Sequence, residues 1–310
     1  MEALRRRLEN ALKEYNEYNP TMNLVLFPDV IRHVCRIARA VSSSAGHALL
    51  VGLGGSGKAS LSRLAAYLCD QSLYRINVSP TYSLLDFKDD VKTMYTKTGV
   101  KDEGVMFLLR DSDILQERYL VYVNDMLGSG DIPDLFTEEE KEAIIGSIMG
   151  KVKALGLPQD QKSCWNFFIE QVRKNLHIVV CMSPASEDFR KRCTRFPALV
   201  TCTVIDWFQP WPADALLSVA QRFLSLAEDL GTENVREAIL RFMPFAFEAA
   251  GRAAKDFLAV EGRRVYNTNK TYLECLKLFN RLLKDRRSEV QEGINRLRNG
   301  LQQLKSASEE

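Results

Sequence analysis

The chain has 310 residues and a formal net charge of +2 at pH 7, so it can form a substantial core and two folding units, and it has no general attraction to nucleic acids or membranes. Its 7 cysteines are odd in number and lack C-x-x-C spacing, which is typical of a reduced intracellular protein and excludes a disulfide framework. Since no apolar run approaches transmembrane length and no hydrophobic signal core follows the N-terminus, we expect a soluble protein with neither a membrane nor a nucleic-acid partner.

Two amphipathic helices are expected near the N-terminus, over residues 2–18 and 29–41. Apolar side chains recur on one side of the first helix, and Asn19-Pro20 ends it because the residue before a proline disfavours helical geometry.

A short apolar strand over residues 48–51 leads into a glycine-rich loop and then a helix. Residues 52–58 fill the G-x-x-x-x-G-K frame of a P-loop (Walker A), in which backbone N–H groups and the helix N-terminus face a phosphate and Lys58 contacts the outer phosphates. The next position of a P-loop should be a Ser or Thr whose hydroxyl binds Mg²⁺. Here that position is Ala59, and Ser60 comes one residue too late. The order of strand, loop and helix disfavours an incidental glycine-rich turn. The candidate nucleotide-binding residues are Gly52, Gly54, Gly55, Ser56, Gly57, Lys58, Ala59 and Ser60.

Four further apolar stretches have the composition of buried strands: residues 74–78, 105–109, 176–182 and 200–205. Helical stretches separate them, which predicts an α/β fold with a mostly parallel sheet and helices on both faces. Residues 131–175 are a helical insertion. After residues 207–212 the pattern becomes all helical, and Pro212 suits the first turn of a helix that runs to about residue 229.

An acidic residue ends the apolar stretch after the first crossover. Asp111 occupies the Walker B position, on a strand expected beside the P-loop strand, where its carboxylate would hold Mg²⁺ directly or through water. A glutamate that polarises the attacking water should come next, but Ser112 occupies that position, and Asp113 is displaced by one residue and is expected to point elsewhere. The alternative is an exposed aspartate that ends a core strand.

Two later features fit a nucleotide site less specifically. Ser183 follows a strand at the place of a γ-phosphate sensor, although Ser-Pro is also an ordinary strand-ending turn. Arg192 and Arg195 are candidate arginine fingers, because an arginine here could neutralise charge at the nucleotide of a neighbouring module. The alternative is a solvated basic helix end.

Residues 271–310 carry an apolar repeat with the spacing of a coiled coil. The repeat positions are Leu276, Leu283, Val290, Leu297 and Leu304, and the companion positions are Leu273, Ile294 and Leu301, with Asn280 and Arg287 as exceptions. This predicts a coiled-coil stripe of about four heptads. Up to residue 283 it can pack on neighbouring helices, whereas the seam beyond 284 suggests a fragment whose partner helix lies past its end.

With these motifs, the chain closely resembles the fourth AAA+ module of an axonemal dynein heavy chain. The P-loop run and four further runs carry the resemblance, which covers nearly the whole chain: residues 22–27, 128–136, 195–200 and 207–212. It implies an AAA+ P-loop parallel sheet with flanking helices, a small helical domain and a coiled-coil helix. The implied parts are a linker helix (1–20), the large α/β domain (21–211, insert about 131–175), the small domain (212–270) and the start of the stalk (271–310).

The resemblance also implies cofactors, partners and a place in the cell. The cofactor is ATP or ADP, with Val25 and Leu26 against adenine, Mg²⁺ binding weakened by Ala59, and Arg192 or Arg195 facing the third module's nucleotide. The partners are neighbouring AAA+ modules of the same heavy chain, the stalk return helix and, through the distal stalk tip outside this chain, the microtubule. The location is the cytoplasm, the cytoskeleton and the ciliary axoneme.

In the family, hydrolysis is driven chiefly by the first module and the fourth is regulatory. Because Ala59 and Ser112 replace catalytic groups, we expect this copy to bind ADP or ATP with weak or no hydrolysis. One alternative is an active ATPase in which water and another acid replace the missing groups. A second is a free-standing P-loop kinase for a small substrate, which the Trp165-containing insert and the unpaired heptads disfavour.

Overall fold

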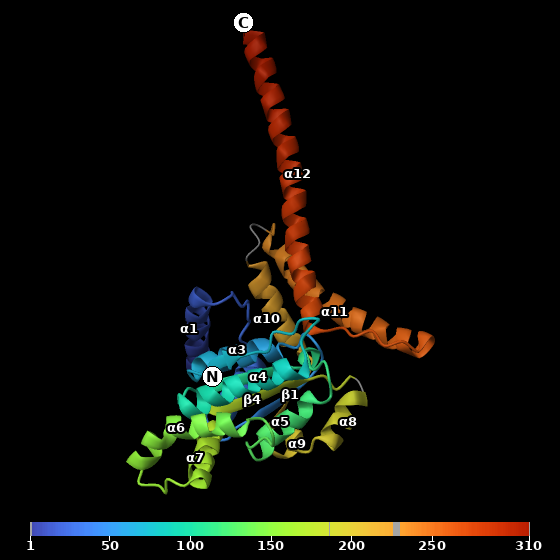
Figure 1. Ribbon diagram of the computed structural model, residues 1–310. Helices are drawn as coiled ribbons and strands as arrows, with labels where there is room; N and C mark the ends of the chain where they lie inside the picture. The colour runs from blue at the N-terminus through green and yellow to red at the C-terminus, as the bar shows by residue number, and fades with distance from the viewer. Residues whose placement is uncertain (1, 186, 226–229, 310) are drawn as a thin grey trace. The chain divides into compact units, whose positions relative to one another are not determined.

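The computed structural model describes residues 2–185, 187–225 and 230–309 (Figure 1). The chain divides into two compact units, Met1–Gln209 and Pro210–Glu310. In the described ranges, no helix combines the length and the apolar character needed to cross a membrane.

Unit 1 is built on a five-stranded sheet in which every pair of neighbouring strands is parallel. The strands are β1 (Ala48–Val51), β2 (Ser72–Tyr74), β3 (Val105–Arg110), β4 (Leu176–Met182) and β5 (Val204–Trp207), in the order β2-β3-β4-β1-β5. All residues of β1 and β4 are buried, as expected for parallel strands covered on both faces. The prediction of a parallel α/β sheet is confirmed.

The positions of two strands and the neighbour of the P-loop strand differ from the sequence expectation. The stretch expected at 74–78 begins where β2 ends, and the stretch expected at 200–205 begins in the short helix α9 (Ala198–Thr201) and overlaps β5 only at its end. Short apolar runs do not distinguish a strand from a helix. The expectation that Asp111 follows a strand beside the P-loop strand was wrong, because β4 lies between β1 and β3. Strand order depends on the crossovers, which the local sequence does not encode.

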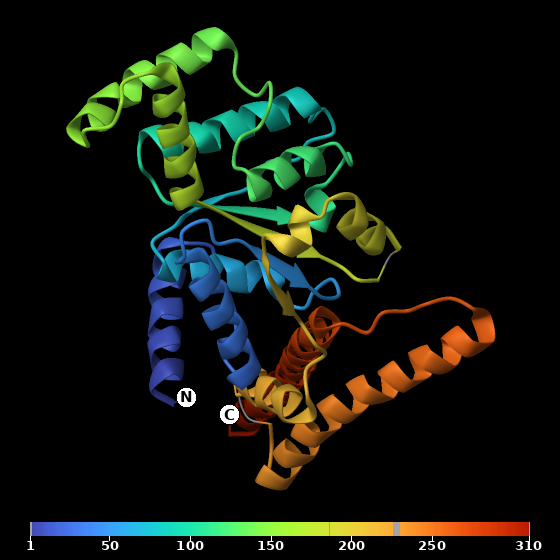
Figure 2. The same cartoon turned by 90° about the horizontal axis from the view of Figure 1, so that it is seen from below.

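Helices cover both faces of the sheet in unit 1. Besides α9, the α-helices are α1 (Glu2–Tyr18), α2 (Pro28–Val41), α3 (Lys58–Leu68), α4 (Leu84–Tyr95), α5 (Tyr119–Gly128), α6 (Glu138–Ala154), α7 (Gln161–Asn175) and α8 (Glu187–Arg195). A π-helical turn, Thr96–Val100, follows α4. Figure 2 shows α2 and α3 on one side of the sheet and α4 and α5 on the other.

The insertion predicted at 131–175 consists of α6 and α7, which pack on each other and on the core of unit 1. Helix α6 begins at a capping box of Thr137 and Glu140, and Asp160 caps α7. The Trp165 ring lies 5.1 Å from the Phe168 ring and 5.9 Å from the Phe136 ring, so aromatic packing anchors the insertion.

The described part of unit 2 is helical: α10 (Ala213–Leu224), α11 (Glu233–Glu261) and α12 (Asn269–Glu309). The predicted end of α10 at about residue 229 lies outside the described residues. Leu276 of α12 is fully buried, and the Tyr272 hydroxyl donates to the Leu216 carbonyl at 2.9 Å, so the first turns of α12 pack on α10.

Further along α12 the apolar repeat continues without cover. The helix is a single uninterrupted element of 41 residues (Figure 1). Its later heptad positions are exposed, and Leu297 retains 71% of its accessible surface. The repeat positions are buried or partly buried up to Leu283 and are exposed from Val290 onward.

Candidate nucleotide site

Parallel strands bring residues far apart in the sequence to one edge of the sheet. The carboxyl end of β1 leads into the P-loop, that of β3 into Asp111, and that of β4 into Ser183. In open α/β sheets, ligands bind in the crevice outside this edge. The structure therefore places the predicted P-loop, acidic and sensor positions at one edge, although β1 and β3 are not neighbours.

The P-loop backbone depends on glycine at two positions for different reasons. Gly57 has φ of +95°, a left-handed conformation that side chains rarely adopt, and it directly precedes α3. Gly52 is restricted by space instead, because a Cβ there would lie 2.7 Å from the Phe208 Cβ. The loop thus presents its backbone close to the N-terminus of α3, where anions bind well.

The Lys58 side chain folds back on the loop that precedes it. Its Nζ donates to the carbonyl oxygens of Gly52 (2.6 Å) and Leu53 (2.8 Å) and to the Ser56 hydroxyl (3.1 Å). Burial lowers the pKa of Lys58, while nearby Cys181 and Asp111 act in the opposite direction. These bonds match the three donors of an ammonium group and hold it against the loop.

Asp111 is paired with an arginine of the same module. Its Oδ1 accepts from Arg192 Nη1 at 2.5 Å, and its Oδ2 accepts from the Ser183 backbone N–H at 3.2 Å. Arg192 Nε also donates to Glu117 at 2.8 Å, so the guanidinium bridges two carboxylates. Burial alone lowers the pKa of Arg192, but the hydrogen bonds and charges of Glu117 and Asp111 raise it overall.

The displaced carboxylate of Asp113 is engaged by hydrogen bonds within its own turn. Asp113 is buried and accepts hydrogen bonds from the Arg110 backbone N–H at 3.1 Å and from its guanidinium at 2.9 and 2.6 Å. The hydrogen bond to Asp113 also raises the pKa of Arg110. Asp113 therefore closes the turn after β3, and the position expected to hold the water-orienting acid is Ser112.

The residues at this edge do not fit a conventional Mg²⁺ site. Mg²⁺ takes oxygen ligands in near-octahedral geometry, commonly from carboxylates and substrate phosphates. Ala59 offers no side-chain oxygen, and Arg192 engages one oxygen of Asp111. Over the part of the chain that the structure describes, no group of three or more His, Cys, Asp or Glu side chains could hold a metal ion.

A second cluster supports the loop from the β5 side. The His33 ring stacks on the Phe208 ring with centroids 4.1 Å apart, and its Nδ1 lies 2.6 Å from Asp206 Oδ2. Arg36 donates to the other Asp206 oxygen at 2.8 Å. Burial alone raises the pKa of Asp206, but these hydrogen bonds from His33 and Arg36 lower it overall. The cluster holds Phe208 against Gly52.

The remaining predicted site residues lie apart from this ion-pair network. Leu26 is fully buried and Val25 is partly buried. Of the two residues expected to contact adenine, only Val25 is accessible in this conformation. Arg195 lies exposed at the end of α8. Sequence reasoning missed Glu117 and the His33–Asp206 contact, because both depend on side chains brought together by the fold.

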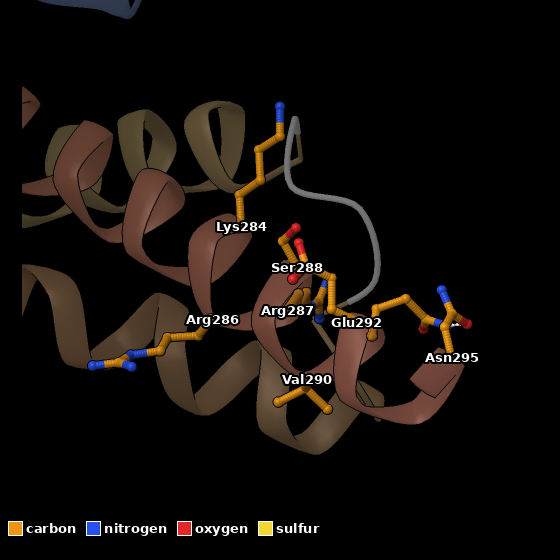
Figure 3. Close-up of a pocket in the computed structure, with 8 residues that line it drawn as sticks. Lys284, Arg286, Arg287, Ser288, Val290, Glu292 and Asn295 are labelled. Carbon is orange, nitrogen blue, oxygen red and sulfur yellow. Dashed lines mark hydrogen bonds between the residues drawn. The ribbon is translucent and has the colours of Figure 1, made fainter. Parts of the chain in front are cut away.

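A hollow elsewhere on the surface is unrelated to these residues. Figure 3 shows that its labelled lining residues all come from α12, with the Lys284 and Arg286 side chains extending in different directions. It lies on the segment whose apolar repeat is exposed, and its lining includes no P-loop residue.

The parallel sheet, the P-loop sequence and the acidic position that follows β3 define an α/β domain of the P-loop AAA+ class. Residues 22–282 match the family model described as P-loop containing dynein motor region D4. The chain belongs to this dynein family.

Relatives at high identity are flagellar and axonemal dynein chains. The chain is 50% identical over 302 residues to the dynein alpha chain of the flagellar outer arm of Chlamydomonas reinhardtii, covering 97% of this chain. It is 45% identical over 308 residues to human dynein axonemal heavy chain 17, covering 99% of this chain. In both comparisons the match spans 7% of the relative's length.

Proposed function

We propose that this chain is a regulatory and structural nucleotide-binding module of a ciliary microtubule motor, which holds ADP or ATP with little or no hydrolysis. The observation that carries the proposal is the combination of an intact P-loop and Lys58 with an Asp111 that is paired to Arg192. Binding elements are present, while two groups that would promote hydrolysis are replaced by Ala59 and Ser112. The names of the relatives support a place in the axoneme.

The exposed half of α12 supports the structural part of this role. Its unpaired apolar repeat fits the outgoing helix of a stalk, whose return helix would cover the seam and whose distal tip would reach the microtubule. Arg195, exposed at the end of α8, is the better candidate to face a neighbouring module, because Arg192 is engaged within this one.

An active ATPase is the alternative, and one observation gives it a candidate acid. Glu117 lies at the same guanidinium as Asp111 and keeps 44% of its side-chain surface exposed. If Arg192 released it, Glu117 could orient water. Turnover that disappears in Glu117→Gln would support this alternative.

The proposal is tested by identifying the nucleotide that the purified chain releases on denaturation and by following MgATP turnover in the same preparation. We expect retained ADP or ATP with no steady turnover, and we expect Lys58→Ala to lose the nucleotide because the loop would lose the positive charge that attracts phosphate. Lys191→Ala, an exposed lysine on α8, is the matched control and should retain it. Steady turnover by the unaltered chain, or equal retention by Lys58→Ala, would contradict the proposal.

A further inference from the structure

Resting on the proposed function, we infer that this site binds its nucleotide without magnesium and that Arg192 provides the cation in its place. The role of a divalent ion here is to neutralise phosphate charge and to link it to the protein carboxylate. In this chain the Arg192 guanidinium is already paired with Asp111, the carboxylate that would bind the ion.

Arg192 competes strongly with a metal ion for the Asp111 oxygen. Arg192 Nη1 lies 2.5 Å from Asp111 Oδ1, and the arginine side chain is 16% exposed, so water screens the pair only partly. Glu117 holds the same guanidinium from its Nε side at 2.8 Å. A metal ion would have to displace an arginine that is fixed at two points.

The ligand position that the P-loop would contribute to a metal ion is also missing. Ala59 is the second residue of α3 and has no hydroxyl to give a metal ion. A nucleotide-bound Mg²⁺ would therefore gain little from either protein position, which removes the usual reason for metal-dependent affinity.

Arg192 can replace the ion because its planar group has donors beyond the two that hold it. Among the described residues, Asp111 and Glu117 engage Nη1 and Nε, which leaves the Nη2 edge for phosphate oxygens. Lys58, whose pKa is influenced by the Asp111 charge, supplies the second positive group. The ligand that this pair fits is a metal-free nucleoside diphosphate or triphosphate.

The test is a titration of the 310-residue chain, stripped of nucleotide, with a fluorescent ADP in excess Mg²⁺ and in EDTA. We expect the two dissociation constants to agree within about twofold, and we expect Arg192→Gln to weaken binding in EDTA by about tenfold, as loss of charge-assisted hydrogen bonds implies. Mg²⁺ should restore part of that loss, because Asp111 is then released. Arg190→Gln, an exposed arginine on the same helix, should behave as the unaltered chain.

A second variant keeps the inference testable if Arg192→Gln does not fold. Ala59→Thr restores the hydroxyl and leaves Arg192 in place, so its binding should remain independent of Mg²⁺. Strong Mg²⁺ dependence in Ala59→Thr or in the unaltered chain would overturn the inference alone. Absence of binding in both buffers would overturn the proposed function and the inference together.

Discussion

At the scale of single residues, a carboxylate is useful to catalysis only where its oxygens are available. Asp113 has its oxygens turned back to Arg110, and Asp111 has one oxygen on Arg192. Phosphoryl transfer depends on positioning and on charge stabilisation, and we propose that both are weakened here. The loss of a single glutamate is therefore one of several departures at this site.

Ser112→Glu tests whether these departures act together. We expect steady-state ATP turnover to rise by less than about tenfold, although a positioned general base alone contributes roughly 10²–10⁴-fold. The reason is that Ala59 and the Arg192–Asp111 pair remain. Ser112→Gln, with nearly the same shape and no charge, is the control. A gain near the full general-base effect would show that the glutamate was the only missing part.

At the scale of elements, the exposed seam of α12 should associate with another helix. We expect the purified chain to self-associate with increasing concentration in analytical ultracentrifugation, because Leu297, Leu301 and Leu304 remain exposed. Replacing Leu297 and Leu304 together by glutamate should raise the dissociation constant at least about tenfold.

The control for this prediction is Arg298→Glu, which adds the same charge beside the seam at an exposed position. If the double variant sediments as the unaltered chain does, the seam is not the contact. Self-association through it would show that the seam can bind a helix, as we propose it does with a return helix.

The elements also show what the sequence could predict. The P-loop strand, β4, the N-terminal helices and the helical insertion follow from runs of apolar residues with regular spacing. β2 and β5 were misplaced because they are short edge strands with exposed residues, including Val204 and Trp207. The Arg192–Asp111 pair joins residues 81 positions apart, and no local pattern encodes such a contact.

At the scale of the whole molecule, a buried histidine makes stability depend on pH. His47 is 5% exposed, accepts a hydrogen bond from the Ile178 backbone N–H, and has a pKa lowered to about 4, first by burial and then by His177 and Arg173. Its unfolded pKa is higher, so between the two values the unfolded chain binds more protons. Folding is therefore most favoured above about pH 6.5 and weakens as the pH falls toward about 4.

His47→Gln should flatten this dependence, because glutamine does not titrate and keeps an acceptor for the Ile178 N–H. Over the full interval we expect His47 to account for a loss of up to about 3 kcal/mol in the free energy of unfolding. Urea unfolding followed by circular dichroism at several pH values measures it. Parallel curves for the variant and the unaltered chain would assign the acid sensitivity to other groups.

The position of Phe208 has a mechanical consequence for the chain. The Phe208 N–H donates to the Val51 carbonyl at 2.8 Å, and its side chain packs at Gly52. The backbone is therefore held against the end of β1 and the start of the P-loop as far as Phe208. The second unit begins at Pro210. Any torque that the long helix exerts on the first unit through the covalent chain must enter at the Gln209–Pro212 joint, where two prolines restrict backbone rotation. Phe208, which contacts Gly52 of the P-loop, would be the first tightly packed residue of unit 1 to receive that torque.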